Sequence, residues 1–497
     1  MSSLHKTVAA SLAVIGLNGC VYGSVNDAST GSAIQGVTVT VASGLCSGSG
    51  CANPIIQSSD SAGEFVFDAY GDLHGEDQVQ IVTPAPGEEA LQLVYSRAGY
   101  DSVSVYHKPR YEEVSQDGKD YFVSGVQTVY LCPLLSVDSD GDGVCDAAES
   151  RYGTSTTSAD TDGDNLSDFA ELFGSGGVDL RYYGANPRKK DVFVELDYYP
   201  NLKPFQAALD RVTAAFANAP LSNPDGSTGV TLHLVLDQQI AVADANMDLD
   251  PAWVDFDVIK DKYFASRRAP FFHYALFANR YEGTGFSGLS RTIPGHDFMV
   301  TMGTWGTPGG TEQQQAGTLM HELGHNLGLQ HGGNEGMNYK GNYLSLMNYS
   351  YQLRGLRVDS VDGVLDYSRL TVGPVNEAFL SELSAFPPLG TTTESVLARY
   401  GVRIGTALRI GTASANLDFN GNTVIQPGLI AQDLNNDGDT SDIINASQND
   451  WTAIVYDGAG SIGDAGLGAA TSLKRAQRFF VTQEKMEPCI SEHEDRQ

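Results

Sequence analysis

The sequence predicts a multidomain protein: an N-terminal antiparallel β-sandwich, a linker of repeated acidic loops, an α/β domain with a mixed sheet, and an irregular C-terminal region. Three observations carry this prediction. Apolar residues alternate with polar ones in short runs between residues 21 and 134, an acidic segment is repeated between residues 138 and 171, and strand and helix patterns alternate between residues 179 and 375. A chain of 497 residues also exceeds the roughly 150 residues of one typical domain.

The composition excludes several classes of protein. The chain has 30 Lys and Arg against 61 Asp and Glu, which gives a formal net charge of -31. Such a charge repels nucleic-acid phosphates and attracts hard cations, so we expect no nucleic-acid partner. No segment after residue 20 has the run of about 20 apolar residues that a membrane-spanning helix needs.

Residues 1–19 are predicted to be an export signal peptide. Lys6 supplies the positive charge, and residues 7–17 form a short apolar or small-residue stretch. The ending Leu-Asn-Gly-Cys at 17–20 resembles a bacterial lipoprotein signal, which implies that Cys20 carries a lipid anchor. The alternative is an ordinary signal peptide cleaved nearby. We therefore expect an exported protein of the cell envelope, attached to a membrane only through lipid.

The six cysteines are interpreted as structural. Cys46 and Cys51, flanked by Gly and Ser, form the favoured disulfide in an oxidising compartment. If Cys20 carries lipid, at least one of the other five is unpaired or intermolecular. No cysteine pair has zinc-site spacing with a nearby histidine.

Residues 20–134 are predicted to form the β-sandwich. The alternating runs are 37–41, 64–67, 79–81, 91–95, 102–106 and 128–131. Gly-Ser-Val-Asn-Asp at 23–27, Gly-Val at 36–37, Ser-Ala-Gly-Glu-Phe at 61–65 and Ala-Gly-Tyr at 98–100 resemble the transthyretin-like domain of secreted carboxypeptidases. The resemblance implies an accessory domain without catalytic residues.

Residues 135–178 contain two copies of an acidic loop. Each copy places acids at loop positions 1, 3, 5, 9 and 12, an arrangement that converges oxygen ligands on one Ca²⁺ ion. The predicted calcium ligands are Asp138, Asp140, Asp142, Asp146 and Glu149 in the first copy, and Asp160, Asp162, Asp164, Asp168 and Glu171 in the second. The copies are similar to thrombospondin type 3 repeats. Asn165 replaces the usual glycine at position 6, which an asparagine tolerates because it can adopt left-handed backbone angles.

A further acidic stretch, 433–439, has positions 1, 3, 5 and 6 of such a loop but no glutamate at position 12. It is either a calcium site with other closing ligands or a polar loop. The stretch 418–422 is a weaker match.

Residues 179–390 are predicted to form the α/β domain. Strands are expected at 191–196, 230–236 and 298–302, and an amphipathic helix at 204–217. A capped helix at 376–386, stopped by two prolines, is expected to close the domain. Residues 391–497 are rich in Gly and Asp and receive no predicted role.

The segment 318–331 carries the chemistry. His321 and His325 lie one helical turn apart, so both imidazoles can bind one metal ion, with Glu322 beside the open coordination position. Gly328 permits a sharp turn that would return His331 as the third ligand. Three neutral imidazoles leave Zn²⁺ its charge and so activate a water molecule, whose proton Glu322 would take.

This pattern, HExxHxxGxxH, resembles the signature of the metzincin clan of zinc endopeptidases. The clan also has a methionine-containing turn beneath the metal, and Tyr-Leu-Ser-Leu-Met-Asn-Tyr at 343–349 fits it. The resemblance implies that Met347 forms the apolar floor of the site and that Tyr349 can donate a hydrogen bond to the oxyanion, as in astacins and serralysins. Gly332 follows the third histidine where those families have Glu or Pro, so the family within the clan stays open.

The sequence therefore predicts a surface-anchored zinc endopeptidase with Zn²⁺ and Ca²⁺ as cofactors and extracellular proteins or peptides as substrates. Two alternatives stay open: a calcium-stiffened adhesin with an inactive metzincin scaffold, and a zinc hydrolase acting on other bonds. The strand at 298–302 is the predicted edge that holds substrate by strand addition. No cysteine-switch pattern precedes the histidines, so no latency mechanism is evident. His273 is interpreted as a packed core residue.

Overall fold

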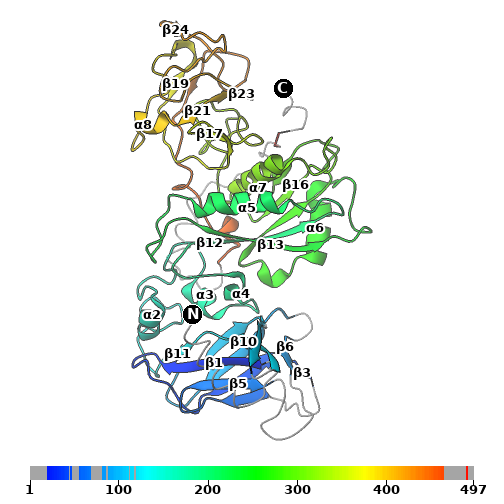
Figure 1. Cartoon of the computed structure of the whole chain (residues 1–497), viewed down its shortest axis with the longest axis vertical. Coiled ribbons are helices and arrows are strands. Elements are labelled where there is room, and N and C mark those ends of the chain that lie inside the picture. Colours follow the sequence, from blue (N-terminus) through cyan, green and yellow to red (C-terminus); the bar gives the residue numbers. More distant parts are fainter. Residues whose placement is uncertain are drawn as a thin grey trace. The chain divides into compact units, whose positions relative to one another are not determined.

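The computed structural model describes a multidomain, sheet-rich chain (Figure 1). The described residues are 20–43, 45–47, 55–68, 81–84, 88–110, 112–116, 119–463 and 489–490. They form two compact units that divide between Arg188 and Lys189. The predicted signal peptide, residues 1–19, lies outside the described residues, as do Cys51 and the side chains of Cys20 and Cys46.

The first unit contains two main sheets. One has the order β11-β1-β10-β9 with β5 also paired to β1, the other has the order β4-β2-β7-β8, and β3 pairs with β6. The strands are β1 (Cys20–Asp27), β2 (Thr38–Ser43), β3 (Leu45–Ser47), β4 (Ile55–Ser58), β5 (Glu64–Asp68), β6 (Ile81–Thr83), β7 (Leu91–Ser96), β8 (Val103–His107), β9 (Glu112–Gln116), β10 (Lys119–Gly125) and β11 (Val129–Leu131). The strands predicted at 37–41, 64–67, 91–95, 102–106 and 128–131 are thus confirmed, whereas the run predicted at 79–81 lies outside the described residues except for Ile81.

The period-two alternation of these strands places apolar side chains in one core. Leu91, Leu93 and Tyr95 of β7 are buried, and they share a hydrophobic cluster with Val25 of β1 and Phe65 of β5. Both sheets therefore contribute to the same core. The expectation of purely antiparallel pairing is wrong for β1, which runs parallel to β10 and β11. Alternation indicates which face of a strand is buried, but it does not identify the neighbouring strand.

Three short helices follow the sheets: α2 (Asp146–Tyr152), α3 (Asp168–Phe173) and α4 (Leu180–Tyr183). The first two each follow one of the acidic loops. A disulfide joins Cys132 to Cys145, the residue that precedes α2. This bridge, which the sequence did not predict, ties the first acidic loop to the end of β11.

The second unit is built on a five-stranded mixed sheet of order β13-β12-β14-β16-β15. Its strands are β12 (Asp191–Tyr198), β13 (Thr231–Gln239), β14 (Phe272–Phe277), β15 (Gly288–Ser290) and β16 (Asp297–Val300), and its helices are α5 (Gln206–Ala217), α6 (Ala252–Tyr263), η1 (Ser266–Arg268) and α7 (Glu312–Asn326). All neighbouring strands are parallel except β15, which is antiparallel to β16. The edge prediction at 298–302 is therefore wrong, because β15 covers β16 and forms the edge itself.

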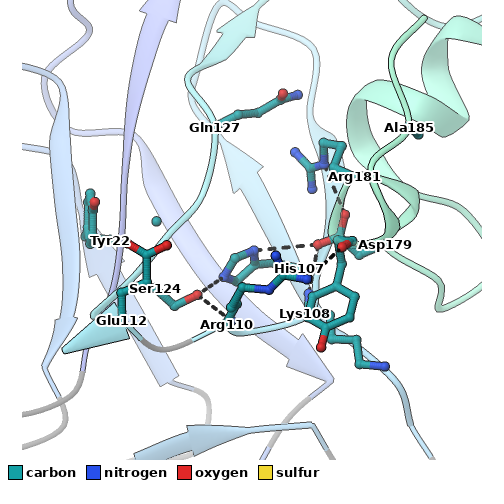
Figure 2. A pocket seen from close by; sticks show the side chains of 12 residues that line it. Tyr22, His107, Lys108, Arg110, Glu112, Ser124, Gln127, Asp179, Arg181 and Ala185 are labelled. Atoms are coloured by element: carbon teal, nitrogen blue, oxygen red, sulfur yellow. Dashed lines mark hydrogen bonds and ion pairs between the residues drawn. The ribbon is translucent and has the colours of Figure 1, made fainter. Parts of the chain in front are cut away.

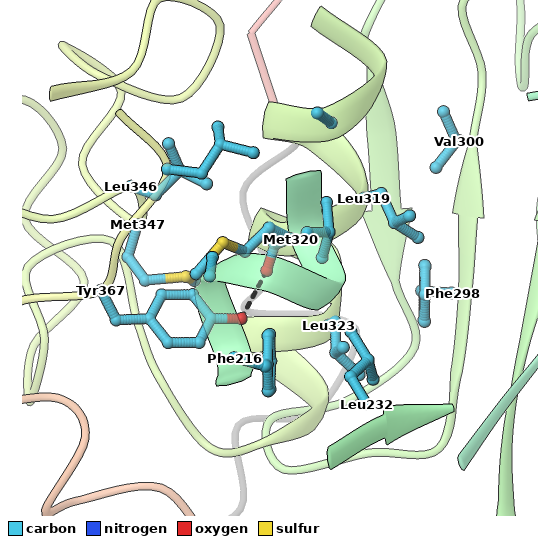
Figure 3. Packing of buried hydrophobic residues seen from close by; sticks show 14 of the residues in the cluster. Phe216, Leu232, Phe298, Val300, Leu319, Met320, Leu323, Leu346, Met347 and Tyr367 are labelled. Atoms are coloured by element: carbon cyan, nitrogen blue, oxygen red, sulfur yellow. Dashed lines mark hydrogen bonds between the residues drawn. The ribbon is translucent and has the colours of Figure 1, made fainter. Parts of the chain in front are cut away.

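The core of this unit lies around α7 (Figure 3). Leu319 and Leu323 of α7 pack with Phe216 of α5 and Phe298 of β16, while α5 also contacts β13. This packing fixes α7 across the sheet. None of the helices in the described part of the chain combines the length and apolar character that a membrane crossing requires.

Residues 344–444 contribute a second hydrophobic cluster in this unit. Its short elements are β17 (Leu356–Val358), β18 (Val361–Val364), β19 (Val375–Asn376), η2 (Glu377–Phe379), β20 (Leu380–Ser381), α8 (Glu394–Leu397), β21 (Tyr400–Gly401), β22 (Arg403–Ile404), β23 (Ala407–Leu408), β24 (Leu429–Ile430) and β25 (Ile443–Ile444), with η3 (Gly458–Gly460) after them. The predicted helix at 376–386 is wrong. Its residues pair instead as β19 with β25 and β20 with β24, since these distant strands satisfy the backbone that a helix would have satisfied locally.

Candidate metal centre

Helix α7 positions the first two histidines. Thr311 and Gln314 form a capping box, in which the Thr311 side chain accepts from the Gln314 backbone N–H and the Gln314 side chain accepts from that of Thr311. The helix then continues to Asn326, and His321 and His325 lie on the same face four residues apart. Both imidazoles are buried, with exposures of 0% and 1%.

The chain reverses immediately after α7. Gly328 has a φ of 91°, which a residue with a Cβ rarely adopts, and the Leu329 N–H donates to Gly324 O. The turn returns His331 to the face that carries His321 and His325. The predicted role of Gly328 as a turn residue is confirmed by its backbone angle.

The three imidazoles converge through their Nε2 atoms. His325 Nε2 lies 3.1 Å from both His321 Nε2 and His331 Nε2. Zn–N bonds of about 2.0–2.1 Å in a tetrahedral site separate neighbouring nitrogens by about 3.3 Å, so this donor set fits a zinc-sized ion. The opposite ring atoms of two histidines donate to the backbone, His321 Nδ1 to Leu346 O at 3.0 Å and His325 Nδ1 to Leu329 O at 2.7 Å. These bonds place the Nε2 lone pairs toward the shared point.

The environment keeps the histidines neutral, as metal ligands must be. Burial lowers the pKa of His325 to about 4. Burial and the neighbouring imidazoles hold the pKa values of His321 and His331 well below the usual value.

Glu322 lies beside the three histidines and is itself fully buried. Ser290 Oγ of the edge strand β15 lies 2.8 Å from Glu322 Oε2 and 2.9 Å from its backbone oxygen. A Cβ at Gly288 would lie only 2.6 Å from Glu322 Oε1, so a side chain at position 288 would displace the carboxylate. Burial raises the pKa of Glu322 to about 7, against the lowering effect of hydrogen bonds from Cys489 and Ser290. The edge strand therefore fixes the carboxylate next to the three histidines.

The turn at 343–349 lies against α7. A Cβ at Gly324 would collide with Sδ of Met347, and Met347 is fully buried beside Tyr367, whose hydroxyl donates to Met320 O at 2.6 Å (Figure 3). Tyr349 packs its ring 4.3 Å from the His331 ring and 5.9 Å from the His321 ring, measured between centroids. Met347 thus contacts α7 at Gly324, and Tyr349 lies beside His321 and His331.

Two further residues of this candidate centre, Asp450 and Cys489, could not be assigned to it from the sequence. Asp450 is fully buried under the turn, where its Oδ2 accepts from Tyr343 Oη at 2.8 Å and from Ser345 Oγ at 2.6 Å. Cys489 places Sγ 2.7 Å from Glu322 Oε1, and its sulfur and one ligand atom of each of the three histidines lie within 4.8 Å of one another. Burial and the Glu322 carboxylate raise the pKa of the Cys489 thiol well above its usual value.

The two acidic loops of the first unit have the same internal geometry. Asp138 accepts from the backbone N–H of Gly141 and Gly143, and Asp160 accepts from those of Gly163 and Asn165. The acid at position 9 stabilises each loop. Asp146 accepts hydrogen bonds from the backbone N–H and the hydroxyl of Ser139, and Asp168 accepts them from the same two groups of Thr161. Asn165 adopts the left-handed φ of 73° expected for position 6.

The position 3 and position 5 carboxylates of each loop lie close to the first one, in the groups Asp138, Asp140, Asp142 and Asp160, Asp162, Asp164. In the first loop, Asp140 Oδ2, Asp142 Oδ2 and both oxygens of Glu149 are buried without a hydrogen-bond partner in the described part of the chain. Burial and the neighbouring carboxylates raise the pKa of Asp142 to about 7 and that of Glu149 to about 8. Glu171, at position 12 of the second loop, is likewise buried. Such oxygens suit a hard divalent cation.

A pocket in the first unit brings together Ser124, His107 and Asp179 (Figure 2). His107 Nε2 lies 3.0 Å from Ser124 Oγ, and Nδ1 lies 3.7 Å from Asp179 Oδ2. Asp179 also accepts from the Lys108 backbone at 2.9 Å and from Arg181 Nε at 3.1 Å. These bonds tie β8 to α4, and we interpret the group as structural. His273 in the second unit is buried on β14, as a packed core residue is expected to be.

Comparisons with known proteins identify no family. No family model matches the sequence, and no curated protein does. One similar solved structure is 3-chlorocatechol 1,2-dioxygenase from Rhodococcus opacus 1CP, at 13% identity and a TM-score of 0.17 over 24% of this chain and 61% of that chain. Another is hydroxyquinol 1,2-dioxygenase from Pseudomonas putida DLL-E4, at 14% identity and a TM-score of 0.16 over 24% of this chain and 57% of that chain.

A third is the pilus 2b backbone protein of group B streptococcus, at 15% identity and a TM-score of 0.13 over 23% of this chain and 41% of that chain. The chain therefore spans less than two thirds of the length of each of these three structures. Structural similarities with TM-scores this low support no conclusion about the fold or the function of this chain.

Proposed function

We propose that the protein is a zinc-dependent endopeptidase of the metzincin type that hydrolyses extracellular proteins or peptides. The observation that carries the proposal is the convergence of three Nε2 atoms, with those of His321 and His331 each 3.1 Å from that of His325, beside the buried Glu322 carboxylate. Three neutral nitrogens with an adjacent carboxylate form the donor set of a hydrolytic zinc site.

His321, His325 and His331 would hold the ion, and a bound Zn²⁺ supplies a positive charge that polarises a peptide carbonyl and increases the acidity of water. Glu322 takes the proton from the attacking water and passes it to the leaving nitrogen. Ser290, 2.8 Å from Glu322 Oε2, keeps that carboxylate in position. Tyr349, packed on His331, would donate a hydrogen bond to the carbonyl oxygen as negative charge develops there.

The edge strand β15 is the surface on which a substrate backbone would pair. It is one of the two outer strands of the five-stranded sheet, and it carries Ser290, the partner of Glu322. An extended peptide added to this edge would lie next to the metal-binding nitrogens. This arrangement favours hydrolysis within a chain.

The acidic loops support calcium as a second cofactor. Buried carboxylate oxygens of Asp140, Asp142 and Glu149 without hydrogen-bond partners in the described residues are costly unless a cation binds them. The ion would hold α2 and the disulfide-linked loop together. Export and lipid attachment at Cys20 belong to the same proposal, and they suit a protein that uses millimolar extracellular calcium.

The test is metal analysis of the purified mature protein together with digestion of an unbiased peptide library. Both the full chain and a chain ending at residue 488 are examined, with His331→Gln as the ligand variant and His296→Gln as the matched histidine outside the centre. We expect one zinc ion per chain and cleavage of internal peptide bonds, both reduced in His331→Gln but not in His296→Gln. Absence of cleavage by every zinc-loaded form would contradict the proposal.

A further inference from the structure

The segment Cys489–Ile490 enters the metal centre from a distant part of the chain. Cys489 and Ile490 are each 2% exposed. Cys489 Sγ contacts Glu322 Oε1 and belongs to the group formed with the three histidines. Ile490 packs into the hydrophobic cluster around α7, and its backbone oxygen accepts from the Ser287 N–H at 2.9 Å.

This segment occupies the two places that a substrate would need. The bond from Ser287 uses the backbone next to β15, which is the edge on which a peptide would pair. The Cys489 thiol contacts the Glu322 carboxylate, where a water molecule would have to bind between this carboxylate and the metal. The carboxylate is fully buried with the thiol in this position. A zinc site with three histidines and one cysteine has four protein ligands, and such closed sites are structural rather than catalytic.

We propose that Cys489 is the fourth ligand of the metal centre and that its segment is an intramolecular inhibitor of the peptidase. The inference rests on the proposed function for its inhibitory part, whereas the ligation by sulfur stands independently. Activity then requires that the sulfur leaves the metal and that Ile490 leaves the edge of β15.

Cobalt substitution tests the sulfur ligand without measuring activity. A thiolate bound to Co²⁺ gives an intense near-ultraviolet charge-transfer band that nitrogen and oxygen ligands do not give. We expect this band in the full-length cobalt protein, and we expect Cys489→Ser and the chain ending at residue 488 to lose it while still binding one metal ion. Absence of the band in the full-length protein would overturn the proposal.

Peptide cleavage by the zinc-loaded forms tests the inhibition. We expect Cys489→Ser and the shortened chain each to cleave at least about tenfold faster than the full-length protein. Equal rates in all three would overturn the inhibitory role and leave the proposed function standing. A thiolate band in the full-length protein with no cleavage by any form would support the sulfur ligand and reject the peptidase function. The two variants alter the segment differently, so a folding defect in one does not decide the result.

A separate observation concerns the loop at 433–442. Asp433 accepts from the backbone N–H of Asn436 at 2.6 Å and of Gly438 at 2.9 Å, at the same offsets as Asp138 in the first acidic loop. Asn435 Oδ1 accepts from the Asp437 N–H at 3.2 Å, as Asp140 Oδ1 does from Asp142. The loop therefore repeats the calcium-loop geometry, but its twelfth position is the buried apolar Ile444.

Glu377 supplies a carboxylate from outside this loop. It is fully buried, Oε1 accepts from the Leu434 N–H at 2.6 Å, and Oε2 has no hydrogen-bond partner among the described residues. The Glu377 N–H also donates to Asp442 O at 3.0 Å, which holds the glutamate against both ends of the loop. From this geometry we infer a further calcium site formed by the loop and closed by Glu377.

A related arrangement, with different hydrogen-bond offsets, occurs at the weaker match at 418–422. Asp418 accepts from the backbone N–H of Asn422 and Thr423. The fully buried Glu382 accepts from the Gln426 N–H through Oε2, while its Oε1 has no hydrogen-bond partner in the described part of the chain. Glu382 is thus the counterpart of Glu377 at this second loop.

Calcium stoichiometry by equilibrium dialysis tests the Glu377 site in the zinc-saturated full chain. We expect Glu377→Gln and Asp437→Asn each to bind one calcium ion fewer than the parent, and the exposed control Glu394→Gln to match it. Asp437 is on the protein surface, so its substitution tests the site even if the buried variant folds poorly. An unchanged stoichiometry in Asp437→Asn and Glu377→Gln would overturn the inference.

Discussion

Ser345 Oγ lies 2.6 Å from Oδ2 of Asp450, a buried residue 105 positions later in the chain. The same Asp450 oxygen accepts from Tyr343 Oη at 2.8 Å and from the Ser368 N–H at 2.8 Å. The turn that carries Met347 is therefore held in place by the region 391–497, for which no role was predicted. This region therefore supports the turn of the candidate metal centre.

Replacing Asp450 by alanine is expected to destabilise the second unit and weaken zinc binding. Four donors, which belong to Tyr343, Ser345, Ser368 and Gln448, would lose the carboxylate that accepts their hydrogen bonds, at a cost of about 3 kcal/mol in the free energy of unfolding. Chemical unfolding and zinc competition measure the two effects. The exposed Asp261→Ala is the matched control, and an Asp450→Ala protein as stable as this control would contradict the structural role.

Tyr349→Phe is expected to lower kcat at least about tenfold, because it removes the hydroxyl that we propose to stabilise the developing oxyanion. Zinc content, thermal stability and KM should stay nearly unchanged, since the ring that packs on His331 is retained. Steady-state kinetics on a peptide substrate, with the chain ending at residue 488 as the parent, make the comparison. A kcat within about threefold of the parent would assign Tyr349 to packing alone.

The local part of the metal centre was predictable from sequence, whereas its supporting residues were not. His321, His325, Gly328 and His331 obey helix spacing and turn chemistry, which are properties of a short segment. Cys489 lies 167 positions from Glu322, and Ser290 and Asp450 also act through tertiary contacts that leave no periodic signal.

The fold, too, could be predicted from the sequence only where local patterns determine it. Period-two alternation located the strands of the first unit, but it could not reveal that β1 pairs in parallel with β10 and β11. The incorrect helix at 376–386 followed from a local cap and two prolines. Pairing of β19 with β25 and of β20 with β24 outweighed those local preferences.

Calcium is expected to protect the first unit from unfolding and proteolysis, and Glu149→Gln is expected to lose part of that protection. The buried Glu149 oxygens have no other partner in the described residues, so the substitution removes a ligand rather than a hydrogen bond. Limited proteolysis and thermal unfolding with and without millimolar calcium, zinc being saturated, measure the effect. The exposed Glu112→Gln serves as control. Identical cleavage with and without calcium in the parent would rule out binding at the loops.

His107 is expected to make the first unit less stable in acid. Burial lowers its pKa from the usual 6.5 to about 4, so between these values the unfolded chain binds a proton that the folded chain does not. The free energy of unfolding should therefore fall as the pH drops from about 6.5 to about 4, by up to about 3 kcal/mol from this group, with no contribution above that range. Chemical unfolding of parent and His107→Gln between pH 7.5 and 4.5 checks this. Parallel pH curves for the two proteins would contradict it.

The most direct test of the zinc peptidase assignment is the Glu322→Gln variant in the chain ending at residue 488. The three histidines are untouched and Ser290 still has a partner, so zinc content should equal that of the parent. Because the amide cannot accept the proton of the attacking water, kcat/KM for an internal peptide bond should fall by about a thousandfold or more. A zinc-loaded Glu322→Gln protein that keeps more than about a tenth of the parent activity would contradict the mechanism.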